Sequence, residues 1–149
     1  MITMLPAALD DARELAPLLR AEDRAEVLAL GCEPVDGLLQ SLTASREAWT
    51  WRDEGRIICI GGVAPLSLIG QTGVPWLLGS DLVPVHRRAF MLETRRMVAR
   101  WLGMFSVLWN VVDARYAEAI RWLRWLGFTL GEPLPIGRGL FRAAVKEAA

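Results

Sequence analysis

Few residues of this chain have the types and spacing that catalysis requires. His86 is the single histidine, and beside Arg87 and Arg88 it is a candidate either for a general base or for a surface residue at a helix start. Asp81 and Asp113 each lie at the end of a predicted strand, on the side of the sheet where α/β proteins bind ligands, so they form a candidate carboxylate pair. Asp81 could equally cap the turn that follows it.

The sequence shows no sign of a metal centre. It contains no nucleophile triad, no phosphate-binding loop and no cluster of ligands at metal-binding spacing. Cys32 and Cys59 follow no metal pattern, and we expect reduced thiols in a cytoplasmic setting. We therefore predict no metal site.

Strands and helices that would position these residues follow one another along the chain. The pattern predicts strands at Met1–Leu5, Ala48–Arg52, Arg56–Pro65, Pro75–Pro84, Val107–Val112 and Gly139–Val145. It predicts two helical pieces around Pro17 that end at Gly31, and helices at Val35–Leu42, Arg87–Phe105 and Ala117–Leu126. Hairpins in the middle and crossovers at the end predict an α/β fold, a mixed sheet flanked by helices in one domain spanning residues 1–149.

Composition excludes several classes of protein. The chain has 149 residues, of which 53% are hydrophobic and 23% charged, as is typical of a globular domain. A net charge of zero gives no general attraction to nucleic acid, and no apolar run is long enough for a membrane span. Acidic residues outnumber basic ones before residue 57, and the reverse holds after it. This asymmetry indicates either two solvated faces or head-to-tail contact between copies.

A family resemblance rests on two segments. The first, Val111–Phe128, reads VVDARYAEAIRWLRWLGF and combines a strand, a turn and a helix that stops at Gly127. The second, Gly73–Phe90, reads GVPWLLGSDLVPVHRRAF. Together they resemble the GNAT family of N-acetyltransferases, and within it the GNAT-like proteins of short-tailed bacteriophages that are described as internal virion proteins or phage acetyltransferases. The resemblance covers nearly the whole chain and implies a GNAT-like acyl-CoA N-acyltransferase fold.

That resemblance also implies where acetyl-CoA would bind if the protein is active. The strand Trp76–Val83 would position the acyl group, and the candidate cofactor contacts are Leu82, Val83, Arg87 and Arg88. Such enzymes cradle the pyrophosphate with two glycines at a helix start. Here Met91 and Glu93 fall near those positions, so we expect steric and electrostatic crowding of the phosphates.

The usual general acid of the family is also replaced. Its tyrosine position corresponds to Leu123, which has no proton to donate. Tyr116 is then the one candidate acid, with a surface tyrosine at the helix start as the alternative. The acidic residues of the early helices, Glu22, Asp23 and Glu26, lie where such enzymes bind the acceptor, although a solvated face explains them equally well.

The last helix also offers a candidate interaction surface. Trp122 and Trp125 are three residues apart on one helix face, flanked by Arg121 and Arg124. Tryptophan and arginine are the residues enriched at binding hot spots. The alternative is that both tryptophans belong to a wide buried face.

These observations lead to a functional expectation. We expect a bacteriophage virion structural protein that acts through protein–protein contacts, on a catalytically degenerate GNAT fold without a cofactor. Its expected partners are other internal, portal or tail proteins of the particle and copies of itself, and it would be made in the host bacterial cytoplasm and reside in the virion. The alternative is an active or divergent acyl-CoA N-acyltransferase, and a third reading is a binding module for a host protein.

Overall fold

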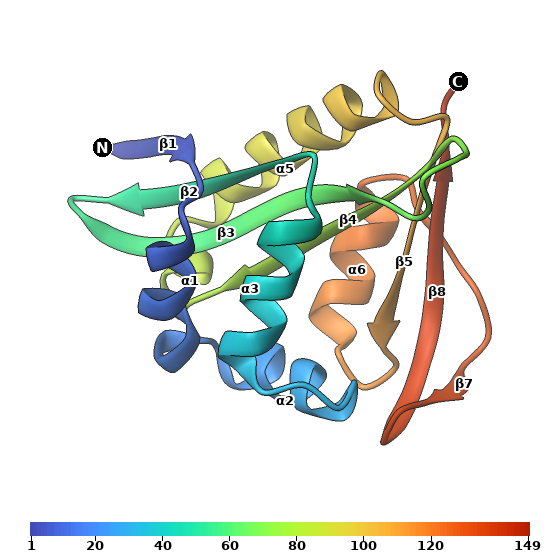
Figure 1. The fold of residues 1–149 in the computed structure, drawn as a ribbon, viewed down its shortest axis with the longest axis horizontal. Helices are drawn as coiled ribbons and strands as arrows, with labels where there is room; N and C mark the ends of the chain where they lie inside the picture. Colours follow the sequence, from blue (N-terminus) through green and yellow to red (C-terminus); the bar gives the residue numbers. More distant parts are fainter.

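A computed structural model describes residues 1–149 and shows one mixed sheet with helices on both faces (Figure 1). The strand order is β1-β2-β3-β4-β5-β8-β6, and β7 pairs with β8. The strands are β1 (Ile2–Pro6), β2 (Glu47–Asp53), β3 (Arg56–Pro65), β4 (Thr72–Gly79), β5 (Val107–Asp113), β6 (Thr129–Leu130), β7 (Leu134–Ile136) and β8 (Gly139–Glu147). The predicted mixed α/β sheet is therefore confirmed.

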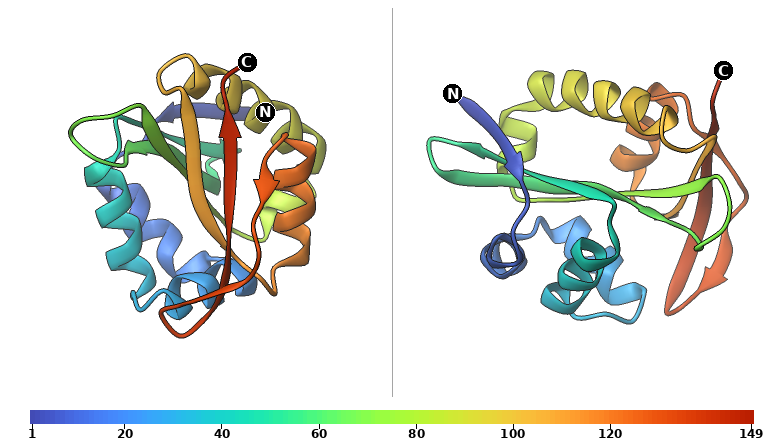
Figure 2. Two further views of the ribbon diagram at one scale, coloured as in Figure 1. Left: turned by 90° about the vertical axis from the view of Figure 1, so that its right-hand side faces the viewer. Right: turned by 45° about the horizontal axis from the view of Figure 1, so that its top comes forward.

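Helices divide between the two faces of this sheet (Figure 2). The helices are α1 (Leu9–Leu15), η1 (Ala16–Leu18), α2 (Ala21–Ala29), α3 (Pro34–Ala44), α4 (Leu82–Val85), α5 (Arg87–Leu102) and α6 (Ala117–Trp125). One core joins α1, η1, α2 and α3 to Ile57, Ile60 and Leu78, and two others join α5 and α6 to the opposite face. No helix is long and apolar enough to cross a membrane.

Most predicted elements are present, with one substantial correction. The strand predicted at Pro75–Pro84 begins earlier and ends at Gly79, because the next residue leaves the ladder. The Ser80 hydroxyl bonds the carbonyl oxygens of Ile57 and Ile58, and Asp81 adopts helical dihedral angles. Leu82–Val85 then forms one helical turn. The two short strands β6 and β7 were absent from the prediction, since each is too short to show a period.

Strands β4 and β5 are paired at only two positions and then diverge. Their parallel register joins Thr72 to Val107 and Gly73 to Leu108. Successive residues of a strand point their backbone groups to alternate sides, and Gln71 accepts a hydrogen bond from Val107 across this junction. The next β4 residue that would donate toward β5 is Pro75, which has no N–H. Proline thus stops the ladder and opens the gap.

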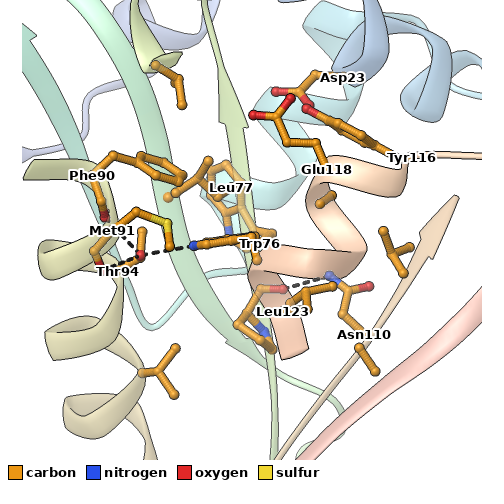
Figure 3. Close-up of a pocket in the computed structure, with 18 of the residues that line it drawn as sticks. Asp23, Trp76, Leu77, Phe90, Met91, Thr94, Asn110, Tyr116, Glu118 and Leu123 are labelled. Atoms are coloured by element: carbon orange, nitrogen blue, oxygen red, sulfur yellow. Dashed lines mark hydrogen bonds between the residues drawn. The ribbon is translucent and has the colours of Figure 1, made fainter. Parts of the chain in front are cut away.

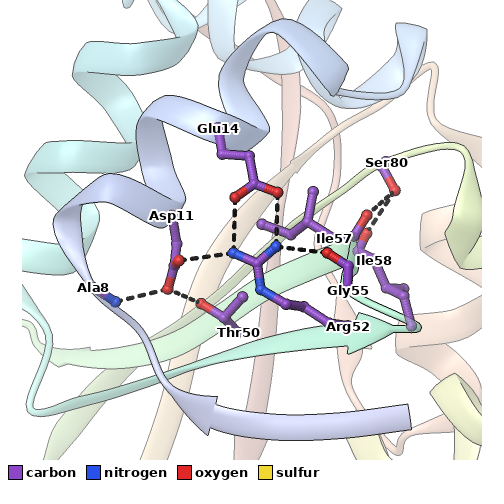
Figure 4. Close-up of polar contacts among 9 residues, drawn as sticks. All are labelled: Ala8, Asp11, Glu14, Thr50, Arg52, Gly55, Ile57, Ile58 and Ser80. Carbon is purple, nitrogen blue, oxygen red and sulfur yellow. Dashed lines mark hydrogen bonds and ion pairs between the residues drawn. The ribbon is translucent and has the colours of Figure 1, made fainter. Parts of the chain in front are cut away.

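A polar cluster fixes the first helices to the sheet (Figure 4). The Arg52 guanidinium on β2 binds Glu14 at 2.7 Å and Asp11 at 2.9 Å, both on α1. Thr50 donates to Asp11 at 2.8 Å, and Asp11 also caps the start of α1 by accepting from the Ala8 N–H. This anchoring holds the chain that leads directly into α2, whose side chains reach the diverging strands.

Candidate functional site

The gap between β4 and β5 opens into a cleft of about 350 Å³. Mostly apolar residues line it, contributed by β2, β3, β4, β5, α5 and α6, with a polar end beside α2. Figure 3 shows Trp76, Leu77 and Leu123 in its middle, Phe90, Met91 and Thr94 along α5, and Asp23, Tyr116 and Glu118 at the polar end. An apolar cleft with a few convergent polar groups is the usual form of a ligand site.

Two carboxylates of α2 close the polar end and satisfy backbone groups of the diverging strands. Asp23 accepts a hydrogen bond at 2.7 Å from the N–H of Gly79, the last residue of β4. Glu26 accepts one at 2.9 Å from the N–H of Asp113, the last residue of β5. Both N–H groups face the gap, where neither has a partner strand. The helix therefore spans the open ends of both strands.

Burial changes the acidity of this cluster. It raises the pKa of Glu26 to about 7, and the nearby carboxylates of Asp23 and Asp113 add to that rise. The pKa of Asp23 is also raised by burial, although its bond to Gly79 and the Tyr116 hydroxyl work in the opposite direction. Burial and the charge of Asp23 raise the pKa of Tyr116. A carboxyl with a pKa near neutrality can exchange protons at physiological pH.

Asn110 bridges the strands where the gap begins. Its side-chain N–H donates to the Pro75 carbonyl of β4 at 2.6 Å, and its side-chain oxygen accepts from the Val111 N–H of β5 at 2.7 Å. Leu77 lies between Pro75 and Gly79 and shares their orientation, so its N–H and C=O face the cleft without a partner strand. The cleft thus offers a free backbone donor at its centre.

The candidate cofactor contacts lie at the start of α5, and only some of them line the cleft. Val83 and Arg87 line it, whereas Leu82 and Arg88 do not. Met91 lines the cleft as well, but Glu93 turns away and pairs with Arg96. The Glu93 carboxylate therefore lies outside the cleft, and the expected crowding of the phosphates by Met91 and Glu93 stays a prediction.

Leu123 lines the centre of the cleft, and Tyr116 lines its polar end (Figure 3). The leucine side chain brings no proton to the middle of the cleft. The tyrosine hydroxyl instead faces Asp23, so it belongs to the same cluster as the α2 carboxylates. The three acidic residues of the early helices do not lie together. Asp23 and Glu26 line the cleft, while Glu22 is exposed.

The two tryptophans of α6 both line the cleft, but they differ in burial. Trp122 is half-buried, its ring centroid lies 5.4 Å from that of Phe90, and its indole N–H donates to the Thr94 hydroxyl at 3.1 Å. Trp125 is 44% exposed, and the Arg95 guanidinium lies over its ring at 5.1 Å. The candidate surface is therefore reduced to Trp125 with the exposed Arg121 and Arg124.

The predicted carboxylate pair of Asp81 and Asp113 is wrong. Asp113 is buried against Arg115, whose guanidinium lies 2.7 Å from it and lowers the pKa of that carboxyl. Asp81 is exposed at the start of α4. His86 lies 3.2 Å from the Asp53 carboxylate and outside the cleft, so a general base at His86 is not supported.

Sequence reasoning missed several residues of the cleft. Asn110, Arg20 and Glu118 line it, and Arg20 bridges to Glu118 at 3.1 Å. The signal for Asn110 was present, because a single amide lies within the apolar strand Val107–Val112. Arg20 and Glu118 are 98 residues apart, and no local pattern predicts their contact. The structure contains no cluster of side chains that could hold a metal ion.

Comparison with solved structures identifies the family of folds to which this structure is similar. No known family model matches the sequence, and no curated protein matches it. An N-acetyltransferase from Staphylococcus aureus matches the structure with a TM-score of 0.74 at 10% identity, covering 99% of this chain and 98% of that one. A GNAT-family acetyltransferase from Streptococcus pneumoniae matches with a TM-score of 0.64 at 14% identity, covering 100% of each chain.

A third match is a variant of spermidine N-acetyltransferase from Vibrio cholerae, with a TM-score of 0.70 at 11% identity, covering 98% of this chain and 93% of that one. At such identities the likeness shows the fold alone. This chain has the GNAT acetyltransferase fold.

Proposed function

We propose, with the GNAT fold as the premise, that this chain binds an acyl thioester of coenzyme A in the cleft and transfers the acyl group to an amine. The observation that carries the proposal is the open cleft itself, with the free N–H of Leu77 at its centre and the Glu26 carboxyl at its polar end. A domain that served only as a rigid building block gains nothing from apolar surface left open to water.

The reaction has a simple balance of atoms. The amine nitrogen attacks the thioester carbonyl carbon, a C–N bond forms, and the C–S bond breaks with its electron pair on sulfur. The amine loses one proton and the thiolate gains one. In this scheme the Leu77 N–H stabilises the carbonyl oxygen, and Glu26, with its pKa near 7, accepts the amine proton.

Tyr116 is the candidate that returns a proton to sulfur. It is the tyrosine that the sequence singled out, and it lines the cleft beside Asp23. Its raised pKa means that the phenol holds its proton tightly, so it is a weak acid for this step. Leu123 offers nothing in its place. We therefore propose a slow transferase in which the acid-catalysed step limits turnover.

At the start of α5, arginine side chains rather than glycines would bind the phosphate groups of coenzyme A. The Phe90 N–H is the first in this helix to bond back along the chain, to His86, so the amides of Arg87, Arg88 and Ala89 are free. Positive side chains and free N–H groups at a helix start suit phosphate. Arg87 is the arginine that also lines the cleft.

Calorimetric titration with acetyl-CoA tests this proposal. We expect a micromolar dissociation constant that rises at least about tenfold in Arg87→Ala, which corresponds to the loss of one charge-assisted contact. Arg88→Ala is the matched control, since its neighbouring guanidinium does not line the cleft. Thiol release from acetyl-CoA in the presence of amines then measures transfer. No binding at millimolar acetyl-CoA would overturn the proposal.

The second candidate function is the virion assembly module, with no cofactor. Two observations favour it: Leu123 stands where the family has its acid, and Trp125 presents an exposed indole between Arg121 and Arg124. Its partners would be copies of this chain and the internal, portal or tail proteins of a phage particle. Light scattering of the chain with and without Trp125→Ala tests self-association. A monomer at high concentration in both forms would count against copies of itself as partners.

A further inference from the structure

The cleft is longer than an acetylated cofactor requires. Its lining residues on α5 run from Arg87 through Met91, Thr94 and Val98 to Trp101, always on one face of the helix. The 14 steps from Arg87 to Trp101, at a rise of 1.5 Å per residue, span about 21 Å. The cleft therefore follows α5 over nearly its whole length.

The pantetheine arm fills only part of this length. About twelve bonds separate its phosphate oxygen from sulfur, equivalent to about four extended residues or ~14 Å. With the phosphate near Arg87, the thioester then lies about two thirds of the way along the cleft. About 7 Å remain beyond it, toward Trp101.

Apolar residues form the inner end of the cleft, which we define by Trp49, Gly61, Met97, Val98 and Trp101. Gly61 on β3 lies directly beside Leu77, because a Cβ there would lie 3.2 Å from the Leu77 side chain. The inner end therefore adjoins the residue whose N–H is the proposed acyl-carbonyl donor.

We propose that the inner end binds the acyl chain of the thioester and selects chains of about four to eight carbons over acetyl. This inference rests on the proposed function, because it assigns the acyl group of the same ligand. The remaining length of about 7 Å accommodates about six methylene groups at their usual spacing, since a three-bond residue extends by ~3.4 Å.

Titration with a series of CoA esters tests this assignment. Hexanoyl-CoA should bind about 100-fold more tightly than acetyl-CoA, because four further methylene groups leave water. Dodecanoyl-CoA should gain nothing further, because its chain exceeds the cleft. Equal binding of acetyl-CoA and hexanoyl-CoA would overturn the chain-length assignment and leave the proposed function intact. Absence of binding by every ester would overturn both.

A pair of variants locates the chain within the protein. Met97→Phe adds volume at the inner end and should weaken hexanoyl-CoA binding about tenfold while leaving acetyl-CoA binding unchanged. Leu102→Phe is the matched control, because Leu102 lies on α5 but does not line the cleft. Equal loss of both esters in Met97→Phe, or the same selectivity change in Leu102→Phe, would contradict the proposed location.

Discussion

Asp23 and Glu26 lie one turn apart on α2, and each accepts a backbone hydrogen bond from the end of a different strand. Asp23 binds the Gly79 N–H of β4 at 2.7 Å, and Glu26 binds the Asp113 N–H of β5 at 2.9 Å. In a continuous sheet the Gly79 N–H would bond to β5, and the Asp113 N–H would bond to β4. The helix replaces the missing ladder, so the same two carboxylates hold the cleft open and supply its charge.

The first prediction concerns stability and pH. Burial raises the pKa of Glu26 from 4.5 to about 7, so the folded chain binds more protons than the unfolded chain between these values. The free energy of unfolding should therefore fall as pH rises through this window, by up to about 3 kcal/mol. Urea unfolding at pH 5, 6 and 7 measures the decline.

Two variants separate Glu26 from the other acids. Glu26→Gln retains an oxygen for the Asp113 N–H and should flatten most of the decline between pH 5 and 7. Glu22→Gln, on the exposed side of the same helix, should leave it unchanged. Acids with lowered pKa values, such as Glu14 and Glu47, lose their stabilising effect only below about pH 4.5. A wild-type stability that rises from pH 5 to 7 would contradict the assignment.

The second prediction concerns Asp23. Asp23→Ala leaves the Gly79 N–H buried without a partner and should lower the free energy of unfolding by about 2 kcal/mol. Asp23→Asn keeps an acceptor oxygen and removes a charge that burial penalises, so it should be close to neutral. Chemical denaturation of both variants gives the comparison. A larger loss in the asparagine variant would show that the charge, rather than the acceptor, holds β4.

Much of the fold was predictable because its elements carry local signals. Pro17 splits the first helices, Gly31 and Gly127 end helices with positive φ, and the β2–β3 hairpin has its glycine turn. The strand Pro75–Pro84 was predicted too long, because its apolar run continues after Gly79. The backbone leaves the sheet there through the Ser80 hydroxyl, which is a tertiary contact.

The site was less predictable, since its geometry depends on contacts between distant segments. The sequence pointed to Tyr116 and Arg87, and both line the cleft. It left the α2 carboxylates undecided, because the N–H groups that bind Asp23 and Glu26 lie 56 and 87 residues away. Trp122 and Trp125 are the same residue type with similar neighbours in the sequence, and only the packing of α6 on α5 makes one half-buried and the other exposed.

The third prediction follows from that separation. Trp122→Ala removes a half-buried indole that packs on Phe90 and bonds Thr94, so it should lower the free energy of unfolding by about 3 kcal/mol. Trp125→Ala should cost less than about 1 kcal/mol, because its indole is 44% exposed and contacts Arg95 at the surface. If urea unfolding showed the same loss in the free energy of unfolding for both variants, the two tryptophans would be equally buried, which would contradict this prediction.

The fourth prediction tests the cause of the open strands. Pro75→Ala supplies an N–H that the parallel register directs toward the Trp109 carbonyl, so the β4–β5 ladder should extend by one bond. The cleft then narrows, and acetyl-CoA affinity should fall about tenfold. Hydrogen exchange at residue 75 reports the new bond. Pro135→Ala in the edge strand β7 is the control and should alter neither measurement.

The last prediction concerns the missing acid. Leu123 lines the centre of the cleft on α6, and the family resemblance of the sequence implies a tyrosine at this position. Leu123→Tyr places a phenol there, and a positioned acid contributes about 10²–10⁴-fold to such a step. On the proposed function, thiol release with an amine acceptor should therefore increase by about 100-fold. Leu123→Phe adds the same ring without the hydroxyl and should not increase it. An equal gain in both variants would indicate improved packing around the thioester. No gain in either variant would show that another step limits turnover, either acceptor binding beside Glu26 or release of the cofactor.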